Sequence, residues 1–337
     1  MLLEVFRKDF DSRLHVFVAQ KLASVSTLTH ATATDAMRAY LAQFIQQGKR
    51  VRPYLVFLLA NETTRLSAEQ LQAACIAHEL VHTFALIHDD VMDQGITRHG
   101  SPTYHLAIQK MNSYAQVEPA MSQAILVGDL VLAWATQIFT QAITDPKAQD
   151  LFFRMLDEVM IGQSGDIHLS NSPLQENNST IIAKDTFKSA HYTFCKPLMV
   201  GATLWWSSDV AGWEELGISL WLAYQLRDDY MDLVWGHDNK TCFSDLHEGN
   251  QTLLLRYALA HLNATDRQQL AGYRWKLLSP EEQSIATALI ERSGALDYGK
   301  QEVTRLLEVA TQQLTALSLP GSAIHTGISD LINKLRI

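Results

Sequence analysis

Apolar residues recur three and four positions apart along most of the chain, which is the spacing of one face of an α-helix. The pattern is clearest in the segments ACIAHELVHTFALIH (74–88), LFFRMLDEVMIG (151–162), LWLAYQLRDDYMDLVW (220–235) and GKQEVTRLLEVATQQLTALS (299–318). Strict alternation of apolar and polar residues, which would indicate strands, is scarce. The pattern therefore predicts an all-α fold.

Helix-breaking residues gather in four places, at 94–102, 112–119, 168–180 and 236–252. Between these places the chain has neither a linker rich in Pro, Gly or Ser nor an internal repeat of solenoid length. We therefore expect one helical domain over residues 1–337, built from a bundle of long helices.

Composition narrows the class of protein. Apolar residues make up 47% of the chain, enough for a substantial core, and the net charge of −9 argues against a nucleic-acid partner. The three cysteines, Cys75, Cys195 and Cys242, are far apart and odd in number, so they predict neither a disulfide framework nor a metal site. A reducing cytoplasmic location fits this usage.

Membrane insertion is not expected. The N-terminal residues MLLEVFRKDFDS carry Glu4, Arg7 and Lys8 and have no long apolar core, so we expect no signal peptide there. The most apolar run, at 125–139, is too short to span a bilayer and contains Asp129. We therefore expect a soluble protein with no transmembrane segment.

Three aspartates, Asp89, Asp90 and Asp93, follow directly after an apolar helical run. Carboxylates this close repel one another and resist burial, so a positive partner is expected. On a helix, Asp89 and Asp93 lie on one face with Asp90 beside them. A single cluster of this kind could also be a solvated helix end.

The same spacing returns at the end of a second apolar helix, in Asp228, Asp229 and Asp232. Two clusters that face each other across a helical cavity could hold several Mg²⁺ ions, because hard divalent cations prefer carboxylate, water and phosphate oxygens. Such ions would clamp a diphosphate and neutralise it as it leaves. The repetition favours a metal–diphosphate site over two unrelated helix ends.

Basic residues accompany both clusters. The segment GKRVRP (48–53) supplies Lys49, Arg50 and Arg52, while Arg98 follows the first cluster and Lys240 follows the second. Each could be an ordinary surface charge, but their recurrence beside the acidic clusters favours phosphate binding.

At this point the sequence resembles the trans-isoprenyl diphosphate synthases, the polyprenyl synthetase family, of short- to medium-chain type. The resemblance runs from about residue 48 to 252. Its motifs occur in the order GKRVRP (48–53), ELVHTFALIHDDVMDQGITRHGSPTYH (79–105), ILVGDL (125–130), GQSGDI (162–167), KSAHYTFCKPLMVGA (188–202), QLRDDYMD (225–232) and SDLHEGNQT (244–252).

This resemblance implies a bundle of long, mostly antiparallel helices around a deep central cavity, in a homodimer. It implies head-to-tail condensation of isopentenyl diphosphate with an allylic diphosphate, through ionisation, condensation and proton loss. It also implies about three Mg²⁺ ions per active site, for which Mn²⁺ can substitute. Electrostatic stabilisation of the leaving group would then carry the catalysis.

The resemblance assigns roles residue by residue. The metal–diphosphate site would use Asp89, Asp90, Asp93, Asp228, Asp229 and Asp232. The allylic diphosphate would contact Arg98, Lys188 and Lys240, and the allylic cation would lie near Ser189 and Gln225. Isopentenyl diphosphate would bind Lys49, Arg52, His82 and His99. Without the family, His82 would be interpreted as a core histidine.

Phe84 lies five residues before Asp89, about 7.5 Å along a helix toward the apolar interior. In the family a bulky aromatic residue at this position resembles a floor that stops elongation. We therefore expect a C15–C20 product, with C20 slightly preferred. The alternative is that Phe84 is ordinary core packing.

Two departures from the family leave other functions open. His99 replaces a second arginine, and Asn250 replaces a lysine that follows Glu248 and Gly249. Each lost charge-assisted hydrogen bond could cost about 1.5–3 kcal/mol. These changes would also suit a weakly active or regulatory subunit of a prenyl synthase. A class I terpene cyclase shares the fold and first cluster, but it usually has a different second metal motif.

Overall fold

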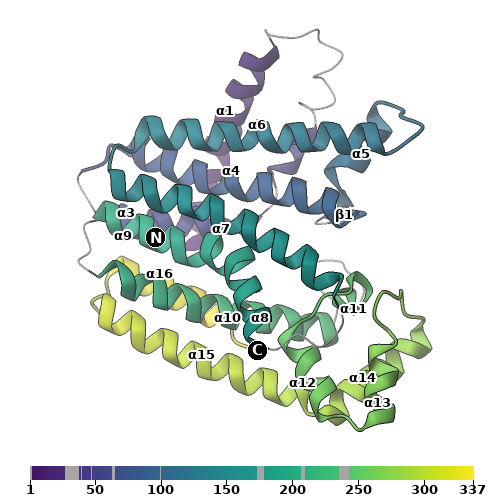
Figure 1. Cartoon of the computed structure of the whole chain (residues 1–337). Coiled ribbons are helices and arrows are strands. Elements are labelled where there is room, and N and C mark those ends of the chain that lie inside the picture. Colours follow the sequence, from purple (N-terminus) through teal and green to yellow (C-terminus); the bar gives the residue numbers. More distant parts are fainter. Residues whose placement is uncertain are drawn as a thin grey trace. The chain divides into compact units, whose positions relative to one another are not determined.

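The computed structural model describes residues 2–26, 38, 40–46, 48–62, 65–98, 100–172, 178–205, 209–234 and 243–337. In these residues the regular structure is almost entirely helical (Figure 1). The strands found there, β1 (Thr97–Arg98) and β2 (Ser101–Pro102), pair as a short antiparallel hairpin. The predicted all-α fold is confirmed.

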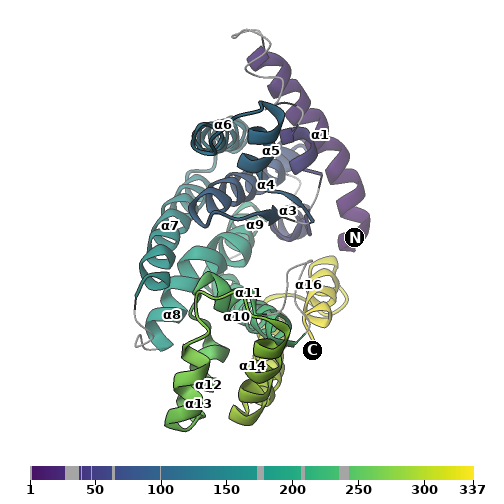
Figure 2. The same ribbon diagram turned by 90° about the vertical axis from the view of Figure 1, so that its right-hand side faces the viewer.

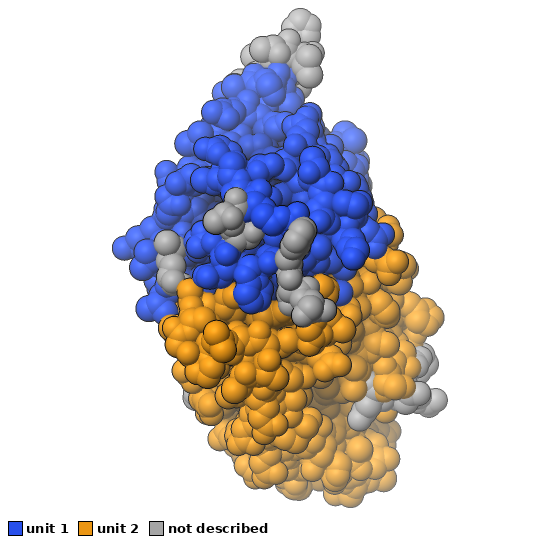
Figure 3. Space-filling model, turned by 90° about the vertical axis from the view of Figure 1, so that its left-hand side faces the viewer, with its two compact units in different colours: residues 1–153, 197–208 blue, residues 154–196, 209–337 orange. Residues whose placement is uncertain are grey.

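The chain divides into two compact units (Figure 3). Unit 1 comprises residues 1–153 and 197–208, and unit 2 comprises residues 154–196 and 209–337. The boundaries fall inside one long helix and at the start of another, so neither unit is a continuous stretch of chain. The expectation of a single domain over residues 1–337 stays a prediction.

Unit 1 is built around long helices from the first half of the chain. Besides the hairpin it contains α1 (Leu3–Ser26), α3 (Val51–Ala60), α4 (Ala68–Met92), α5 (Tyr104–Met111), α6 (Glu118–Ala142), the first part of α7 (Pro146–Ser170) and most of α9 (Lys196–Trp205). Its core contains the fully buried side chains of Leu14, Leu41, Tyr54, Leu55, Leu59, Leu80, Phe139 and Phe152.

Helices α4 and α6 lie side by side and run antiparallel (Figure 1). Near one end, Gln70 of α4 donates to the carbonyl of Ala142 at 3.0 Å. Near the other, His88 Nε2 lies 3.0 Å from the carbonyl oxygen of Ile125. The start of α4 is set by a capping box, in which Ser67 and Gln70 each bond the other's backbone N–H.

The apolar run at 125–139 belongs to a longer helix than the sequence indicated. Helix α6 has 25 residues and, among the residues described, is the one helix long and apolar enough to cross a membrane by those two criteria. The length argument against a span therefore does not hold. Of its most apolar window, 39% is buried, and a helix that packs in a protein core passes the same test.

Unit 2 contains the remaining elements. They are the rest of α7, α8 (Asn178–Asp185), η1 (Thr186–Cys195, a π-helix), α10 (Val210–Val234), α11 (Ser244–Glu248), α12 (Leu253–His261), α13 (Ala264–Ala271), α14 (Pro280–Ser293), α15 (Ala295–Leu317) and α16 (Ala323–Lys334). Figure 2 shows α12 and α14 side by side. Trp213 and Trp221 of α10 are the largest fully buried side chains of this unit.

Helix α10 is the central helix of unit 2, because it packs against both α15 and η1. It runs antiparallel to α15: Gly212 near its start approaches Leu317, and Tyr230 near its end approaches Gly299. A Cβ on Gly217 would lie 2.7 Å from the Cα of Cys195, so this glycine permits close approach of η1. The long antiparallel helices predicted from the sequence are present within each unit.

Candidate active site

The first aspartate cluster lies at the C-terminal end of α4. Asp89 and Asp90 occupy its last turn, and Asp93 caps it, donating its backbone N–H to the Asp89 carbonyl at 2.8 Å. Arg98 on β1 reaches back to this end: Nη2 bonds Asp89 Oδ2 at 3.2 Å, and Nε bonds Asp90 Oδ1 at 3.0 Å. The guanidinium offsets the repulsion between the two carboxylates.

The electrostatics of this end are dominated by that contact. Asp90 is buried, whereas the Asp89 and Arg98 side chains keep about a quarter of their surface exposed. Burial disfavours the charged guanidinium, but the neighbouring carboxylates of Asp90 and Asp89 outweigh it and raise the pKa of Arg98. Arg98 therefore stays charged, next to the cluster that the sequence predicted as its neighbour.

Helix α6 holds the end of α4 in place through His88. A Cβ on Gly128 would lie 2.3 Å from the His88 imidazole, so only glycine leaves room for this ring. The Phe84 ring also packs against His88, with the two ring centres 4.7 Å apart, and Phe84 is 6% exposed. The motif ILVGDL thus has a structural basis, since its glycine lets the helices approach beside the aspartates.

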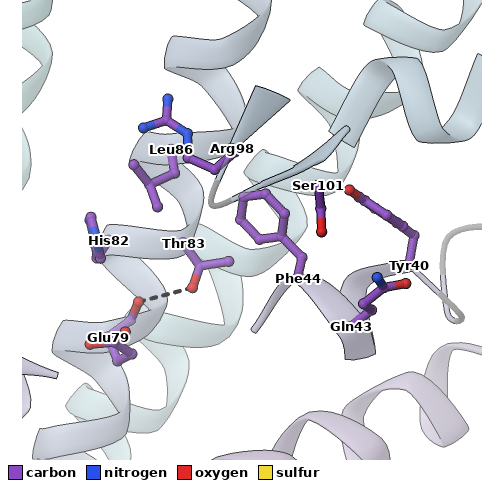
Figure 4. A pocket seen from close by; sticks show the side chains of 9 residues that line it. All are labelled: Tyr40, Gln43, Phe44, Glu79, His82, Thr83, Leu86, Arg98 and Ser101. Atoms are coloured by element: carbon purple, nitrogen blue, oxygen red, sulfur yellow. Dashed lines mark hydrogen bonds between the residues drawn. The ribbon is translucent and has the colours of Figure 1, made fainter. Parts of the chain in front are cut away.

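A narrow pocket lies between α4, the helical residues 40–44 and the β1–β2 hairpin (Figure 4). The cavity volume of about 20 Å³ leaves room for about one water molecule. The lining side chains are Tyr40, Gln43, Phe44, Glu79, His82, Thr83, Leu86, Arg98 and Ser101. The structure thus brings His82 and Arg98 to one pocket.

The three cations of GKRVRP differ sharply in environment. Lys49 is exposed, and Arg52 is partly exposed in the first turn of α3. Arg50, in contrast, is 3% exposed, and its donors are directed at protein acceptors, among them Asp11 and Glu79. Lys49 and Arg52 are therefore accessible candidates for phosphate binding, whereas Arg50 is buried among protein acceptors.

The second aspartate cluster occupies the last turns of α10 in unit 2. Asp228 is partly exposed, while Asp229 and Asp232 are buried. Gln225 donates its amide to Asp229 Oδ1 at 2.7 Å, which orients that carboxylate. Asp228 is consequently the most accessible carboxylate of this cluster.

Asp232 has a distinct set of partners at the start of α11. Its Oδ1 accepts from Ser244 Oγ at 2.6 Å and from Ser244 N at 3.0 Å, and its Oδ2 accepts from Asp245 N at 3.2 Å. These bonds satisfy backbone N–H groups that a helix start leaves without intrahelical partners. Asp232 thereby ties α11 to α10.

Lys188 and Ser189 lie in the π-helix η1, which sequence periodicity did not predict. The Lys188 ammonium donates to Asp166 Oδ2 of α7, and Asp166 is 7% exposed. A Cβ on Gly162 would lie 2.1 Å from the backbone nitrogen of Lys188, so the glycine of GQSGDI allows the two segments to touch. Short π-helices occur often at functional sites.

Asn250 makes local contacts in place of the family's lysine. Its amide donates to Asp245 Oδ1 and to Glu248 Oε2, each at 3.1 Å. Asn250 therefore links the turn after α11 to that helix. Two further predicted site residues, His99 and Lys240, lie outside the described residues.

The predicted site residues fall into one set in each unit. Unit 1 holds Lys49, Arg52, His82, Phe84, Asp89, Asp90, Asp93 and Arg98, and unit 2 holds Lys188, Ser189, Gln225, Asp228, Asp229 and Asp232. Their functional roles stay predictions. Sequence reasoning missed Glu79, Asp166 and Gly128, although a glutamate inside the apolar run AHELVH was a signal of a buried pair.

Over the described ranges, no three His, Cys, Asp or Glu side chains converge on a ready metal cage. Mg²⁺ does not need one, because it is usually held by one or two carboxylates together with waters and substrate phosphates. Asp89 in unit 1 and Asp228 in unit 2 each keep a partly exposed carboxylate, which is the kind of group that Mg²⁺ takes as a ligand.

Comparison with known proteins identifies relatives along nearly the whole chain. A model of the polyprenyl synthetase family matches residues 34–287. A geranylgeranyl diphosphate synthase of Sulfolobus acidocaldarius is 29% identical over 296 residues, covering 83% of this chain and 85% of the relative. A short chain isoprenyl diphosphate synthase of Methanothermobacter thermautotrophicus is 28% identical, covering 87% of each chain.

Among solved structures, the geranylgeranyl pyrophosphate synthase of Corynebacterium glutamicum, complexed with isoprenyl diphosphate and magnesium, is similar with a TM-score of 0.88. It is 27% identical, and the match covers 99% of both chains. The similarity therefore extends over the complete fold and beyond the motifs.

Proposed function

Because the chain belongs to the polyprenyl synthetase family of prenyltransferases, we propose that it condenses isopentenyl diphosphate head to tail with an allylic diphosphate. The product is a linear C15–C20 prenyl diphosphate. One observation carries this proposal: two aspartate clusters of identical spacing each end a helix of 25 residues, α4 and α10.

The allylic diphosphate is the substrate that these clusters serve. The six aspartates of the two clusters, Asp89, Asp90, Asp93, Asp228, Asp229 and Asp232, would hold Mg²⁺ together with the diphosphate. Bound Mg²⁺ would supply positive charge that neutralises the diphosphate as it leaves. The similar geranylgeranyl pyrophosphate synthase of Corynebacterium glutamicum was crystallised in complex with magnesium, which supports the choice of metal for this chain.

Arg98 and Lys188 would contact the same diphosphate. In the structure each already pairs with carboxylates, Arg98 with Asp89 and Asp90 and Lys188 with Asp166. These pairs stabilise the separate charges before substrate arrives. Binding would exchange partners, so that cations turn to the diphosphate while carboxylates become available for metal. Ser189 and Gln225, which carry polar oxygens, would stabilise the allylic cation.

Isopentenyl diphosphate would bind Lys49, Arg52 and His82 of unit 1. Lys49 and Arg52 flank the start of α3, and His82 lines the narrow pocket on α4. A proton is lost after the new bond forms, with the departing pyrophosphate as its acceptor. Asn250, at the position of the family's lysine, bonds Asp245 and Glu248 instead.

Two further features support a homodimer and a cytoplasmic location. Ile125 and Leu126 of α6 are 43% and 66% exposed, an apolar surface that supports a homodimer through this helix. Cys75 and Cys195 are free thiols in the part of the chain that is described, which supports a cytoplasmic location.

The deciding experiment incubates the purified chain alone with Mg²⁺, labelled isopentenyl diphosphate and allylic primers of several lengths. Linear prenyl diphosphates support the proposal. Cyclised hydrocarbon would identify a terpene cyclase, and turnover that requires a partner synthase would identify a regulatory subunit. A matched reaction with Asp89→Asn controls for contaminating activity, because that variant should lose turnover while remaining folded.

A further inference from the structure

A buried ion network surrounds Arg50, just before α3. Its Nε donates to Asp11 Oδ1 at 2.6 Å, its Nη1 donates to Glu79 Oε1 at 2.5 Å, and its Nη2 donates to the carbonyl of Ile45. Arg50 and Glu79 are 3% and 2% exposed. A guanidinium with this many protein acceptors is not free to bind a substrate phosphate.

This network connects four separate segments of unit 1. Asp11 belongs to α1, Ile45 follows the helical residues 40–44, Glu79 belongs to α4, and Arg50 immediately precedes α3. One side chain therefore bonds residues from three other segments of the chain. Removing either partner of such a buried pair would leave the other charge uncompensated.

The local backbone is shaped around the same side chain. Arg50 has φ 55° and ψ 29°, a left-handed conformation that is costly for a residue with a Cβ. Gly48 has φ 143°, and a Cβ there would lie 2.8 Å from Arg50 Nη1 and 3.4 Å from Glu79 Oε1. The loop from Gly48 to Arg50 is thus folded closely over the ion pair.

The position of the pair matters because proposed substrate ligands adjoin both of its members. Lys49 precedes Arg50 directly, and Arg52 follows two residues later in the first turn of α3. On α4, Glu79 lies three residues before His82, so both share one helix face and line the same pocket (Figure 4). The ion pair therefore links the segment that carries Lys49 and Arg52 to the helix that carries His82.

We infer that Arg50 and Glu79 form a positioning pair, which holds the isopentenyl diphosphate ligands of α3 and α4 in register without touching the substrate. This inference rests on the function proposed above. It accounts for the glycine and the first arginine of GKRVRP, whereas the lysine and the second arginine are the proposed ligands.

The test compares steady-state kinetics of the wild type with Arg50→Lys and with the paired variant Arg50→Met/Glu79→Met. Lysine keeps the charge but loses the planar fork that bonds several acceptors at once. The paired variant removes both charges, and such apolar replacement often restores the stability that a single substitution loses. Thermal unfolding of each variant is recorded alongside the kinetics.

Both variants should raise the KM for isopentenyl diphosphate on the order of 10-fold or more, because small displacements of binding groups are costly. The KM for the allylic diphosphate should stay within about 2-fold of the wild type. The control is Leu307→Ala in α15 of unit 2, a fully buried site that should reduce thermal stability without a selective change in either KM.

Three results would overturn the inference. They are an unchanged KM for isopentenyl diphosphate, an equal rise of both KM values, and a paired variant that recovers substrate affinity together with stability. A wild type that fails to use isopentenyl diphosphate at all would remove the proposed function and this inference with it. An active wild type with unaffected variants would remove the positioning role alone.

Discussion

Phe84 offers the sharpest test of what ends chain growth. Its side chain is 6% exposed, and it lies five residues, about 7.5 Å, before Asp89 along α4. If the allylic tail extends from the aspartates toward the apolar part of α4, this ring is the obstacle that it meets. The substitution Phe84→Ala should therefore lengthen the product.

The size of the change can be worked out from the side chain. Alanine lacks the six ring carbons of phenylalanine, and one isoprene unit has five carbons, so the space freed corresponds to about one more unit. A C20 producer should become mainly a C25 producer. The cavity should also lower the free energy of unfolding by about 3–5 kcal/mol. His88 keeps its contacts with Ile125 and Gly128, so the aspartates should remain in place.

The assay separates dephosphorylated products by reversed-phase chromatography after reaction with one allylic primer and excess isopentenyl diphosphate. Phe10→Ala is the matched control, since Phe10 of α1 is 3% exposed and stacks on Phe6 in the same unit. The control should lose stability but keep the wild-type product. A folded, active Phe84→Ala enzyme with an unchanged product distribution would refute the hypothesis that Phe84 stops chain elongation.

The remaining predictions concern charge. Asp89→Asn and Asp228→Asn should each lower kcat/KM by about 10²–10³. If both clusters bind one diphosphate, the loss in the double variant should be smaller than the product of the two single losses. Fully multiplicative losses would contradict this. Asp232→Asn should lower the free energy of unfolding by about 1–3 kcal/mol in urea titrations, because α11 loses charged acceptors, and an unchanged midpoint would count against that role. Burial lowers the pKa of His78 to about 4, so its stabilising contribution is complete above pH 6.5 and is lost as the pH falls toward 4. Protonation of His78 should therefore lower the free energy of unfolding by about 3 kcal/mol in acid. His78→Phe should remove this pH dependence from denaturation curves measured between those pH values.

Helical periodicity predicted the course of the chain well but not every boundary. Helix α7 continues to Ser170, into the segment at 168–180 that was predicted to break it. The π-helix η1 was not foreseen, because π-helices are rare and usually occur as short insertions in α-helices. Its path depends on the close contact at Gly162, which involves residues distant in sequence.

The sequence predicted candidate site residues wherever these residues lie close together along the chain. The aspartate clusters are visible because their spacing of one and four residues has a direct geometric meaning on a helix. The sequence did not predict which opposite charges pair with each other, since Arg50 meets Glu79 across 29 residues and Lys188 meets Asp166 across 22 residues. A formal charge in a sequence does not specify which opposite charge it will meet.

From the amino-acid order alone came the helical class, the family and the acidic residues of the site, because each depends on spacing along one helix or on short motifs. The environment of each charge emerged only when the helices packed. Arg50 and Lys49 are neighbours in one motif, yet one is buried against Asp11 and Glu79 and the other is exposed. That difference arises from which segments enclose each side chain, and close packing between distant segments sets it.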